Sequence, residues 1–571
     1  MKKEYDVIIV GAGISGALIA TRLAGMYKNG KKAAANKLNI LILEAGEDRS
    51  ARAELVEMYL NALPSKRTPG SPYKLPPGVN MAPSPDSTND YYDQSQVHDN
   101  NQFKSTYERR VGGSTWHWLG NCPRLLPNDF KSNTLYGLGE DWPIAYSDLE
   151  PWYCEAEHEI GVSGDHNELN NYFGAFRSKA FPMNRIWPSY SDLVISKRLV
   201  NADNTHKQYN DLPLVLVNTP QARNSSPYNG RPVCTGNSIC VPICPVGAKY
   251  DAVIHIEKAQ AASKAVDLVS KAVVTSINCN TETGMIESVT YKSWDKKENT
   301  ISAHLFVLAA NAIETPKILL MSKLPSKNDN VGRFLMDHPQ GEGVCTSREP
   351  LFPFRGPPTT SGIDKFRDGK FREKNCAFRL SMGNDGGGRT RSTQDVLNEV
   401  VAGDFGATLK QGLNDKLTRL FRISFLAEMR PLFNNRVTLS TLNDPTGMGI
   451  PPPKLQFTVD DYTMGNFENI SKVMSSIFKT LDPVGDILLP NNKTEHKGAG
   501  HIMGTCRMGT NKKNSVVDME CRSHEHANLF IAGSSVFPTG GTANPTLTIA
   551  ALSLRIADSI KKQLNLINGS T

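Results

Sequence analysis

A glycine-rich turn between two apolar runs is the feature that most constrains the fold of this 571-residue chain. The run Tyr5–Val10 has the β-branched, apolar character of a buried parallel strand, and the hexapeptide GAGISG, residues 11–16, follows it directly. A helix-forming stretch, 17–23, and a second apolar run, Leu38–Leu43, come next. This order predicts an α/β fold that begins with a β-α-β unit and carries G-x-G-x-x-G in the tight turn.

The glycines and the acid of this unit each have an expected task in dinucleotide binding. Gly11 permits the turn, Gly13 lets the backbone approach a pyrophosphate at the helix N-terminus, and Gly16 lets helix and strand pack closely. Glu44 stands at the end of the second strand, where an acid binds ribose hydroxyls. The pattern predicts a bound dinucleotide; a glycine-rich turn without a ligand is the alternative.

A second glycine-rich segment, VGGSTWHW at 111–118, has the composition of a loop beside a flat cofactor. Gly112 and Gly113 allow close backbone approach, and Ser114 and Thr115 can donate hydrogen bonds. His117 lies between two tryptophans, and taken alone this position favours a packed core residue.

The C-terminal part contains a further group of motifs. His501 begins the sequence HIMGTCRMG, and 528–533 reads as a strand entering a turn. Asn544, Pro545 and Thr546 then open a helix that runs to about residue 564. Pro545 suits the first helical turn, with Asn544 as its cap. The partial positive charge of such a helix start would stabilise an anion, such as a reduced flavin ring.

Together these motifs, with 306–316 and 330–333, resemble those of the glucose-methanol-choline oxidoreductase family, in the same order over nearly the whole chain. The resemblance implies FAD, held by a Rossmann-like domain built from discontinuous segments, and a substrate domain of a sheet plus helices. We assign 1–48, 100–135, 251–345 and 496–571 to the FAD-binding domain and 346–495 to the substrate domain. The interval 136–250 is connecting structure. In the substrate domain, 457–459 has a strand pattern and 462–481 has helical spacing.

The resemblance also implies roles for individual residues. His501 would be the catalytic base and Asn544 the second polar group, which fits the chemistry: neutral imidazole can take a hydroxyl proton, and an amide can hold the alcohol oxygen. Val274 would contact the adenine through its backbone, and His117 would either be joined covalently to the flavin or contact its ring. The remaining expected cofactor contacts are Gly112, Gly113, Ser114, Trp118, Gly533, Pro545 and Thr546. In this chain Gly533-Ser534-Ser535 replaces the common Asp-Ala-Ser, so a carboxylate contact to the cofactor is lost.

Three of the ten cysteines are concentrated in eleven residues: Cys234, Cys240 and Cys244, with a proline following the last. Zinc sites favour C-x2-C pairs and a fourth ligand, and disulfides would leave one thiol over. Three thiolates and a Cys-Pro step suit an iron–sulfur cluster, with three irons favoured over four. A four-iron cluster would need another ligand, such as Cys122, and three buried structural thiols are the alternative. The segment 220–250 resembles the catalytic subunits of bacterial membrane-bound sugar dehydrogenases.

This second resemblance implies a dehydrogenase that hands single electrons to a protein. Its partners would be a small subunit that carries the export signal and a multihaem cytochrome c, with membrane attachment only through the partner. We expect the periplasmic side of the bacterial inner membrane, with the cytoplasm as the alternative. The net charge of +7 includes no Lys/Arg run of the nucleic-acid-binding type, and no apolar run is long enough to span a bilayer.

The expected substrate is a sugar, polyol or sugar acid, and the sequence does not select among glucose, fructose, gluconate and sorbitol. Two other functions remain open at this point. An oxidase of the same fold would pass electrons to oxygen, and a non-catalytic FAD or electron-transfer subunit would have lost its base. His501 and Asn544 are both present.

Overall fold

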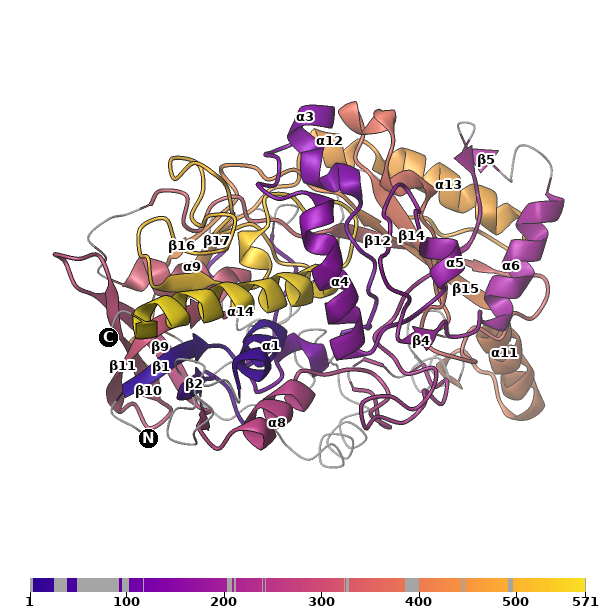
Figure 1. The fold of residues 1–571 in the computed structure, drawn as a ribbon. Helices are drawn as coiled ribbons and strands as arrows, with labels where there is room; N and C mark the ends of the chain where they lie inside the picture. The colour runs from indigo at the N-terminus through magenta and orange to yellow at the C-terminus, as the bar shows by residue number, and fades with distance from the viewer. Residues whose placement is uncertain are drawn as a thin grey trace.

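The computed structural model describes residues 4–24, 38–48, 92–94, 102–116, 118–202, 208–209, 212–238, 240–241, 243–322, 324, 328–385, 400–442, 444, 447–490 and 497–569. Two sheets organise these residues, one at each side of the molecule in the view of Figure 1. The fold is mixed α/β, as predicted. Among the described helices, none combines the length and the apolar character needed to cross a membrane.

The first sheet has seven strands and forms around the predicted β-α-β unit. Its order is β8-β2-β1-β11-β10-β9, with β19 paired to β11. β1, β2, β8, β11 and β19 pair in parallel, whereas β9 and β10 form an antiparallel arm. From its second residue onward β1 is continuously buried, as expected for a central parallel strand. The bounds are β1 Glu4–Val10, β2 Ile40–Leu43, β8 Val266–Val269, β9 Ala272–Cys279, β10 Ile286–Ser293, β11 Glu298–Leu308 and β19 Leu529–Ile531.

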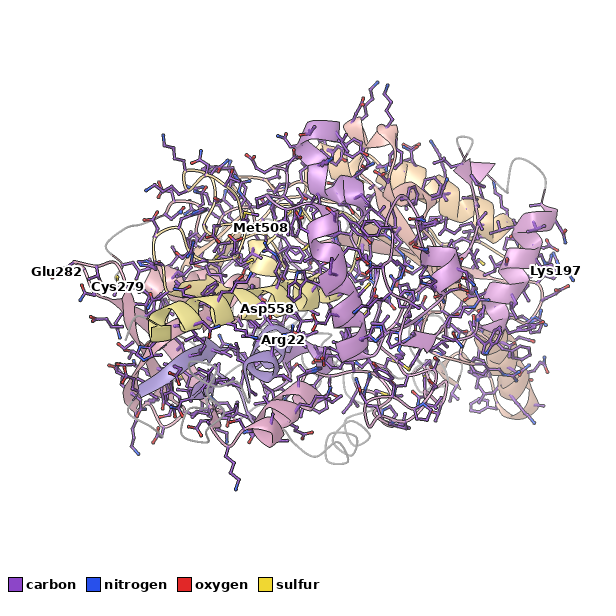
Figure 2. All side chains as sticks on the ribbon, viewed as in Figure 1. Arg22, Lys197, Cys279, Glu282, Met508 and Asp558 are labelled. Carbon is purple, nitrogen blue, oxygen red and sulfur yellow. The ribbon has the colours of Figure 1, made fainter. Side chains whose placement is uncertain are left out.

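Helices cover this sheet and fix the position of the glycine turn. α1 (Ile14–Leu23) contacts both α14 (Thr546–Gly569) and α8 (Val253–Ala262), and α4 (Tyr146–Ile160) contacts α14. In Figure 1 the yellow α14 lies alongside the indigo α1. At the surface, Nε of Arg22 on α1 lies 3.2 Å from Oδ1 of Asp558 on α14 (Figure 2). The first and last helices of the domain therefore pack directly on each other.

The second sheet is antiparallel, with the order β18-β12-β15-β14-β13-β7. Every second residue of β15 is buried, because one face of the sheet packs on a core. α13 supplies part of this core with apolar residues at helical spacing, including Phe467, Ile470, Met474 and Phe478. The bounds are β7 Val217–Asn218, β12 Pro339–Thr346, β13 Ser361–Ile363, β14 Phe378–Met382, β15 Leu420–Ala427, β18 Lys497–Gly498 and α13 Phe467–Lys479.

The remaining elements are short or peripheral. Three longer ones are α6 (Tyr190–Asn201), α9 (Asn311–Met321) and α11 (Gly406–Arg419). The others are η4 Gly113–Trp116, η5 Pro127–Lys131, α3 Ser132–Tyr136, β3 Ser163–Gly164, α5 His166–Leu169, β4 Met183–Asn184, β5 Gln208–Tyr209, β6 Leu212–Pro213, η6 Lys365–Arg367, η7 Lys370–Glu373, β16 Arg436–Leu439, β17 Pro453–Gln456, α12 Asp461–Met464 and η8 Ser534–Val536.

The second sheet draws strands from four of the sequence intervals assigned above, with β13, β14 and β15 in 346–495. β12 lies in 251–345 apart from its last residue, β7 lies in 136–250, and β18 lies in 496–571. The strand expected at 457–459 is not formed there; β17 precedes it at Pro453–Gln456. The helical spacing of 462–481 corresponds to α13 and the end of α12. The chain thus passes between the two sheets several times, and the space between them is lined by both.

Candidate active site

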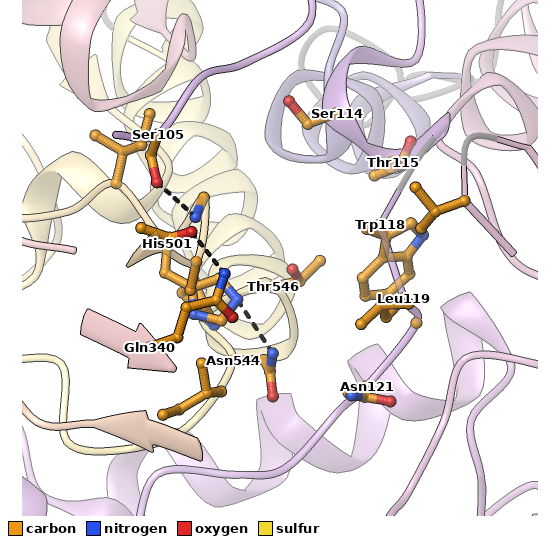
Figure 3. A pocket seen from close by; sticks show the side chains of 18 of the residues that line it. Ser105, Ser114, Thr115, Trp118, Leu119, Asn121, Gln340, His501, Asn544 and Thr546 are labelled. Atoms are coloured by element: carbon orange, nitrogen blue, oxygen red, sulfur yellow. Dashed lines mark hydrogen bonds between the residues drawn. The ribbon is translucent and has the colours of Figure 1, made fainter. Parts of the chain in front are cut away.

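A cavity of about 410 Å³ extends from the glycine turn to the cysteine segment. Gly13 of the glycine turn and Val241, next to Cys240, both line it. Figure 3 shows His501, Asn544 and Gln340 on one wall, and Thr115, Trp118 and Leu119 on the opposite wall. The cavity therefore brings together most of the motifs that the sequence analysis singled out.

The glycine turn presents open backbone to this cavity. Gly11 has φ +106°, and a Cβ there would lie 2.5 Å from the carbonyl oxygen of Ala309. A Cβ on Gly16 would lie 2.0 Å from the carbonyl oxygen of Gly11, whereas one on Gly13 would meet nothing within 4 Å. Two of the glycines are thus required by packing, and the third leaves space in front of the start of α1, where the geometry fits a pyrophosphate.

Glu44 lies directly behind this turn. Its carboxylate accepts hydrogen bonds from the backbone N–H groups of Ala12 and Gly46, each at 2.9 Å. Burial raises the pKa of Glu44, and these bonds act in the opposite direction. Glu44 therefore stabilises the turn itself, and its contact with a ribose remains a prediction.

Val274 lies in β9, whose first residue contacts Glu44. The N–H of Ala272, at the start of β9, donates to the carbonyl of Glu44 at 2.8 Å. Val274 is buried in the same strand. Its backbone contact with an adenine remains a prediction.

The second glycine-rich loop packs on the first. The N–H of Gly112 donates to the carbonyl of Ala12 at 2.9 Å, and a Cβ on Gly113 would lie 3.2 Å from Cα of Gly13. Ser114 lines the cavity with an exposed side chain, and its hydroxyl accepts from the N–H of Glu108. Trp118 donates from its indole N–H to the carbonyl of Tyr250. His117 lies outside the described residues.

His501 is held by a second histidine, His338, that the sequence analysis missed. Nδ1 of His501 lies 2.8 Å from Nδ1 of His338, and Nε2 of His338 lies 3.0 Å from the carbonyl oxygen of Gly541. A carbonyl can only accept, so Nε2 of His338 carries the proton and its Nδ1 accepts. Nδ1 of His501 must then be the donor, which leaves Nε2 of His501 with a free lone pair.

Both histidines are kept neutral. Burial holds the pKa of His501 well below its usual range, and His338 lowers it further. Burial also lowers the pKa of His338 to about 4. A neutral imidazole with an available Nε2 lone pair is the state that a general base requires.

Asn544 meets this lone pair from the start of α14. Its Nδ2 lies 3.1 Å from Nε2 of His501, while its Oδ1 is buried without a hydrogen-bond partner (Figure 3). The prediction that Asn544 caps the helix with its side chain is wrong, because Oδ1, the atom that would accept from the helix N–H groups, has no partner among the described residues. Pro545 and Thr546 line the cavity beside it, as does Gly533, whose φ is +100°. An unpaired buried carbonyl oxygen is costly unless a ligand donates to it.

Asp337 fixes the backbone around both histidines. Its Oδ1 accepts from the N–H groups of His338 and His501 at 2.7 and 2.9 Å, and its Oδ2 accepts from the hydroxyl of Ser105. Burial raises the pKa of Asp337, and these hydrogen bonds act against the increase. The sequence signal for this arrangement is the Asp-His pair immediately before Pro339, the first residue of β12.

The wall formed by the second sheet is polar. Arg422 on β15 donates to Asp385 at 2.6 Å and to Glu342 at 3.2 Å, and Arg422, Asp385, Gln340 and Ser424 line the cavity. None of these residues was predicted, because no sequence motif marks them. A wall of charged and amide groups can satisfy several hydroxyls of one ligand.

The three clustered cysteines lie in the segment that contributes Val241 to the cavity lining, but none of the three lines the cavity. Cys240 and Cys244 are buried, Cys234 is half-buried, and burial raises the pKa of Cys234. No disulfide joins any of the ten cysteines, all of which are described. Within the described ranges, however, no three His, Cys, Asp or Glu side chains are gathered closely enough to hold a metal ion. The geometry therefore does not support the predicted iron–sulfur ligand set.

Buried cations lie close to these thiols. Arg223 lowers the pKa of Cys234, whereas Cys240 and Cys244 raise it. Lys249 donates from Nζ to the carbonyl of Cys240 at 2.9 Å. Cys122 interacts with the same segment. Its N–H donates to the carbonyl of Pro220 and its thiol to the carbonyl of Gly120, and Arg223 and Arg231 oppose the rise in its pKa that burial causes.

Comparison with known proteins gives a consistent family. Two models described as GMC oxidoreductase match residues 218–340 and 431–553. The chain is 34% identical to the fructose dehydrogenase large subunit of Gluconobacter japonicus, over 98% of each. It is 22% identical to the gluconate 2-dehydrogenase flavoprotein of Pantoea cypripedii, over 98% of this chain and 94% of that one. A formate oxidase variant from Aspergillus oryzae shares the fold, with a TM-score of 0.63, 17% identity and 98% of each chain covered.

Proposed function

Since the chain belongs to the glucose-methanol-choline oxidoreductase family, we propose that it is a dehydrogenase that oxidises one alcohol group of a sugar, polyol or sugar acid. The family acts with FAD on CH–OH groups. The observation that carries the proposal is the proton arrangement of His501, whose Nε2 lone pair faces the cavity beside Asn544.

The two side chains divide the work on the alcohol. A substrate hydroxyl that displaces the amide from Nε2 of His501 would donate its proton there. Its oxygen would accept from Nδ2 of Asn544, which turns the carbon–hydrogen bond away from the pair and toward the opposite wall. The unpaired Oδ1 of Asn544 would accept from a neighbouring hydroxyl of the same substrate.

FAD fits the part of the cavity that the glycine turn and the second glycine-rich loop line. Gly11, Gly13 and Gly16 would hold the pyrophosphate, and Gly112, Gly113 and Ser114 would border the ring. When bound, FAD supplies the acceptor for the hydride. His501 holds the proton that leaves the hydroxyl, and the surrounding walls exclude water from it. A covalent link through His117 is part of the proposal, and FAD that stays with the chain after denaturation would support it.

The spacing of the cysteines supports an electron exit at their segment. Cys234, Cys240 and Cys244 would be the ligands of an iron–sulfur cluster, with three irons rather than four, and such a cluster would supply one-electron transfer to a cytochrome c partner. The similarity to a protein named as a large subunit supports a complex. A small export subunit, a periplasmic location and membrane contact through the partner complete the proposal.

The test of the reaction is anaerobic reduction of the flavin by a panel of sugars, polyols and aldonates. We expect bleaching of the flavin absorbance with at least one of them. Hydrogen peroxide formation in air at the rate of substrate oxidation would instead indicate an oxidase. A flavin that no member of the panel reduces would favour the non-catalytic alternative.

The cluster requires a separate measurement. We expect three irons per chain and a low-temperature electron paramagnetic resonance signal in the oxidised protein. A protein that reduces its flavin with substrate yet contains no iron would contradict the cluster and leave the dehydrogenase assignment in place.

A further inference from the structure

A buried amide oxygen on the wall opposite His501 has no hydrogen-bond partner. Asn121 is 5% exposed and lines the cavity, and its Oδ1 is buried without a partner among the described residues. Figure 3 shows Asn121 and Leu119 on the wall that faces Asn544. The backbone at this position is fixed, because Asn121 forms a β-bridge with Gln221. The amide is therefore held by its main chain while its oxygen remains available to a ligand.

A second oxygen of the same kind lies across the cavity. Of the buried side-chain oxygens that lack a partner within the described ranges, two line the cavity, Oδ1 of Asn121 and Oδ1 of Asn544. A buried acceptor without a donor costs free energy, so both positions favour a ligand that brings its own donors. Hydroxyl groups on neighbouring carbons can supply them, since each hydroxyl donates one hydrogen bond and can still accept others.

Arg422 supplies the complementary donors on the second sheet. Its Nη2 and Nε lie 2.6 and 3.3 Å from the two carboxylate oxygens of Asp385, and its Nη1 lies 3.2 Å from Glu342. A guanidinium has five N–H groups, and in the part of the chain that the structure describes these bonds use three of them. The side chain is 14% exposed and held from two sides. It can therefore direct its remaining N–H groups at a ligand in the cavity.

The charge around Arg422 favours hydroxyls over a carboxylate as its ligand. Asp385 and Glu342 place two negative charges beside one positive charge. Burial acts to raise the pKa of Glu342, but Arg422 and Lys497 lower it below its ordinary value, so this acid is ionised at neutral pH. Lys497 is largely exposed, and solvent screens its charge. Lys104 also lines the cavity and is the alternative partner for a carboxylate.

We propose that Asn121 and Arg422 are specificity residues that bind hydroxyl groups away from the reacting carbon and restrict the substrate to a neutral sugar or polyol. The inference rests on the proposed dehydrogenase function and names the substrate class within it. One hydroxyl would donate to Oδ1 of Asn121, and another would accept from Arg422 while it donates to Asp385. A simple alcohol would leave these groups unsatisfied, and a carboxylate at Arg422 would meet two others.

The first measurement is anaerobic flavin reduction in the wild-type protein with three classes of alcohol. Neutral hexoses and hexitols form one class, gluconate represents the sugar acids, and propan-1-ol represents the simple alcohols. We expect the ratio of limiting rate to apparent Kd to be at least about 100-fold higher for the best neutral sugar or polyol than for the other two. A preference for gluconate would overturn the inference, and its loss in Lys104→Met would assign the carboxylate to Lys104.

Asn121 is tested by a pair of variants of similar size. Asn121→Leu removes the acceptor, so the apparent Kd of the best neutral substrate should rise about 10- to 100-fold, while the limiting rate of reduction stays within about threefold. Asn121→Asp keeps an acceptor oxygen and should remain closer to the wild-type Kd. An unchanged Kd in Asn121→Leu, with FAD retained, would overturn the role of Asn121.

Glu342→Gln tests the charge argument. It removes one negative charge beside Arg422 and keeps the side-chain shape, so the discrimination against gluconate should fall about tenfold. Glu468→Gln is the matched control, because Glu468 pairs with Lys472 on the exposed side of α13, and it should leave the discrimination unchanged. Unchanged discrimination in Glu342→Gln would overturn the role of Arg422. A wild-type flavin that no compound reduces would overturn the proposed function, whereas normal reduction with unchanged constants in the variants would overturn this inference alone.

Discussion

Two groups of buried ionisable residues in this molecule are accommodated in opposite ways. Beside the cavity, His338 and His501 are buried as neutral rings, and each proton between the Gly541 carbonyl and Asn544 has a definite position. Beside the cysteine segment, Arg223, Arg231 and Lys249 are buried with neutral hydrogen-bond acceptors. Among the described residues, Oδ1 of Asn544 is left without a partner in the first group, and in the second group Nε of Arg223 and Nε of Arg231 are. The difference shows that a fold can bury ionisable groups either by keeping them neutral or by surrounding their charge with neutral acceptors.

The largest effect is expected from removal of the proposed base, His501. His501→Ala should slow anaerobic flavin reduction by about 10²- to 10⁴-fold, because the hydroxyl proton loses its acceptor. Bound FAD and iron content should stay at wild-type levels, since the glycine turn and the cysteine segment are unchanged. Stopped-flow absorbance measures the rate, and an unchanged rate would contradict the role of His501.

Acid should lower the free energy of unfolding, because His338 is buried in its neutral form. The pKa of His338 falls from about 6.5 in the unfolded chain to about 4 in the folded chain. The unfolded state therefore binds more protons between these values, so the free energy of unfolding is unaffected above pH 6.5 and decreases as the pH falls toward 4. The loss from His338 alone is about 3 kcal/mol. Urea unfolding at a series of pH values measures it, and His338→Gln should have a shallower slope.

Removal of His338, which fixes the tautomer of His501, should have a smaller effect on the rate than removal of the base. His338→Leu leaves Nδ1 of His501 without its acceptor and no longer fixes the tautomer, so flavin reduction should slow on the order of 10²-fold. His338→Gln can donate to the Gly541 carbonyl and accept from His501. It should therefore restore most of the rate. Equal losses in the two variants would show that the ring fills space and does not direct the proton.

The smallest effect is expected from a substitution of the surface residue Arg22, which serves as a control for the buried groups. Arg22 is about one-third exposed and pairs with Asp558 and Glu155. Arg22→Met should lower the free energy of unfolding by less than about 1 kcal/mol. The rate of flavin reduction should not change. A slower rate would mean that this surface charge acts on the active site over a long distance.

Local motifs could be predicted from the sequence, but their partners could not. The glycine turn and the strands around it depend on neighbours in the sequence, and they form where the pattern places them. His338 was missed because its task depends on Gly541 and His501, which the second sheet brings close. The cap assigned to Asn544 was wrong, since its Oδ1 has no partner among the described residues. The cysteine cluster was visible as a spacing, but the neutral acceptors around Arg223, Arg231 and Lys249 are a property of the tertiary structure alone.

The strand order of the first sheet also has a consequence for biosynthesis. β1, β11 and β19 lie side by side, yet they come from the start, the middle and the last part of the sequence. A chain emerging from the ribosome therefore exposes the apolar faces of β1 and α1 until β19 and α14 have been made. Such long waiting times favour aggregation of nascent chains. Production of active protein should therefore depend strongly on chaperones and on slow translation at low temperature.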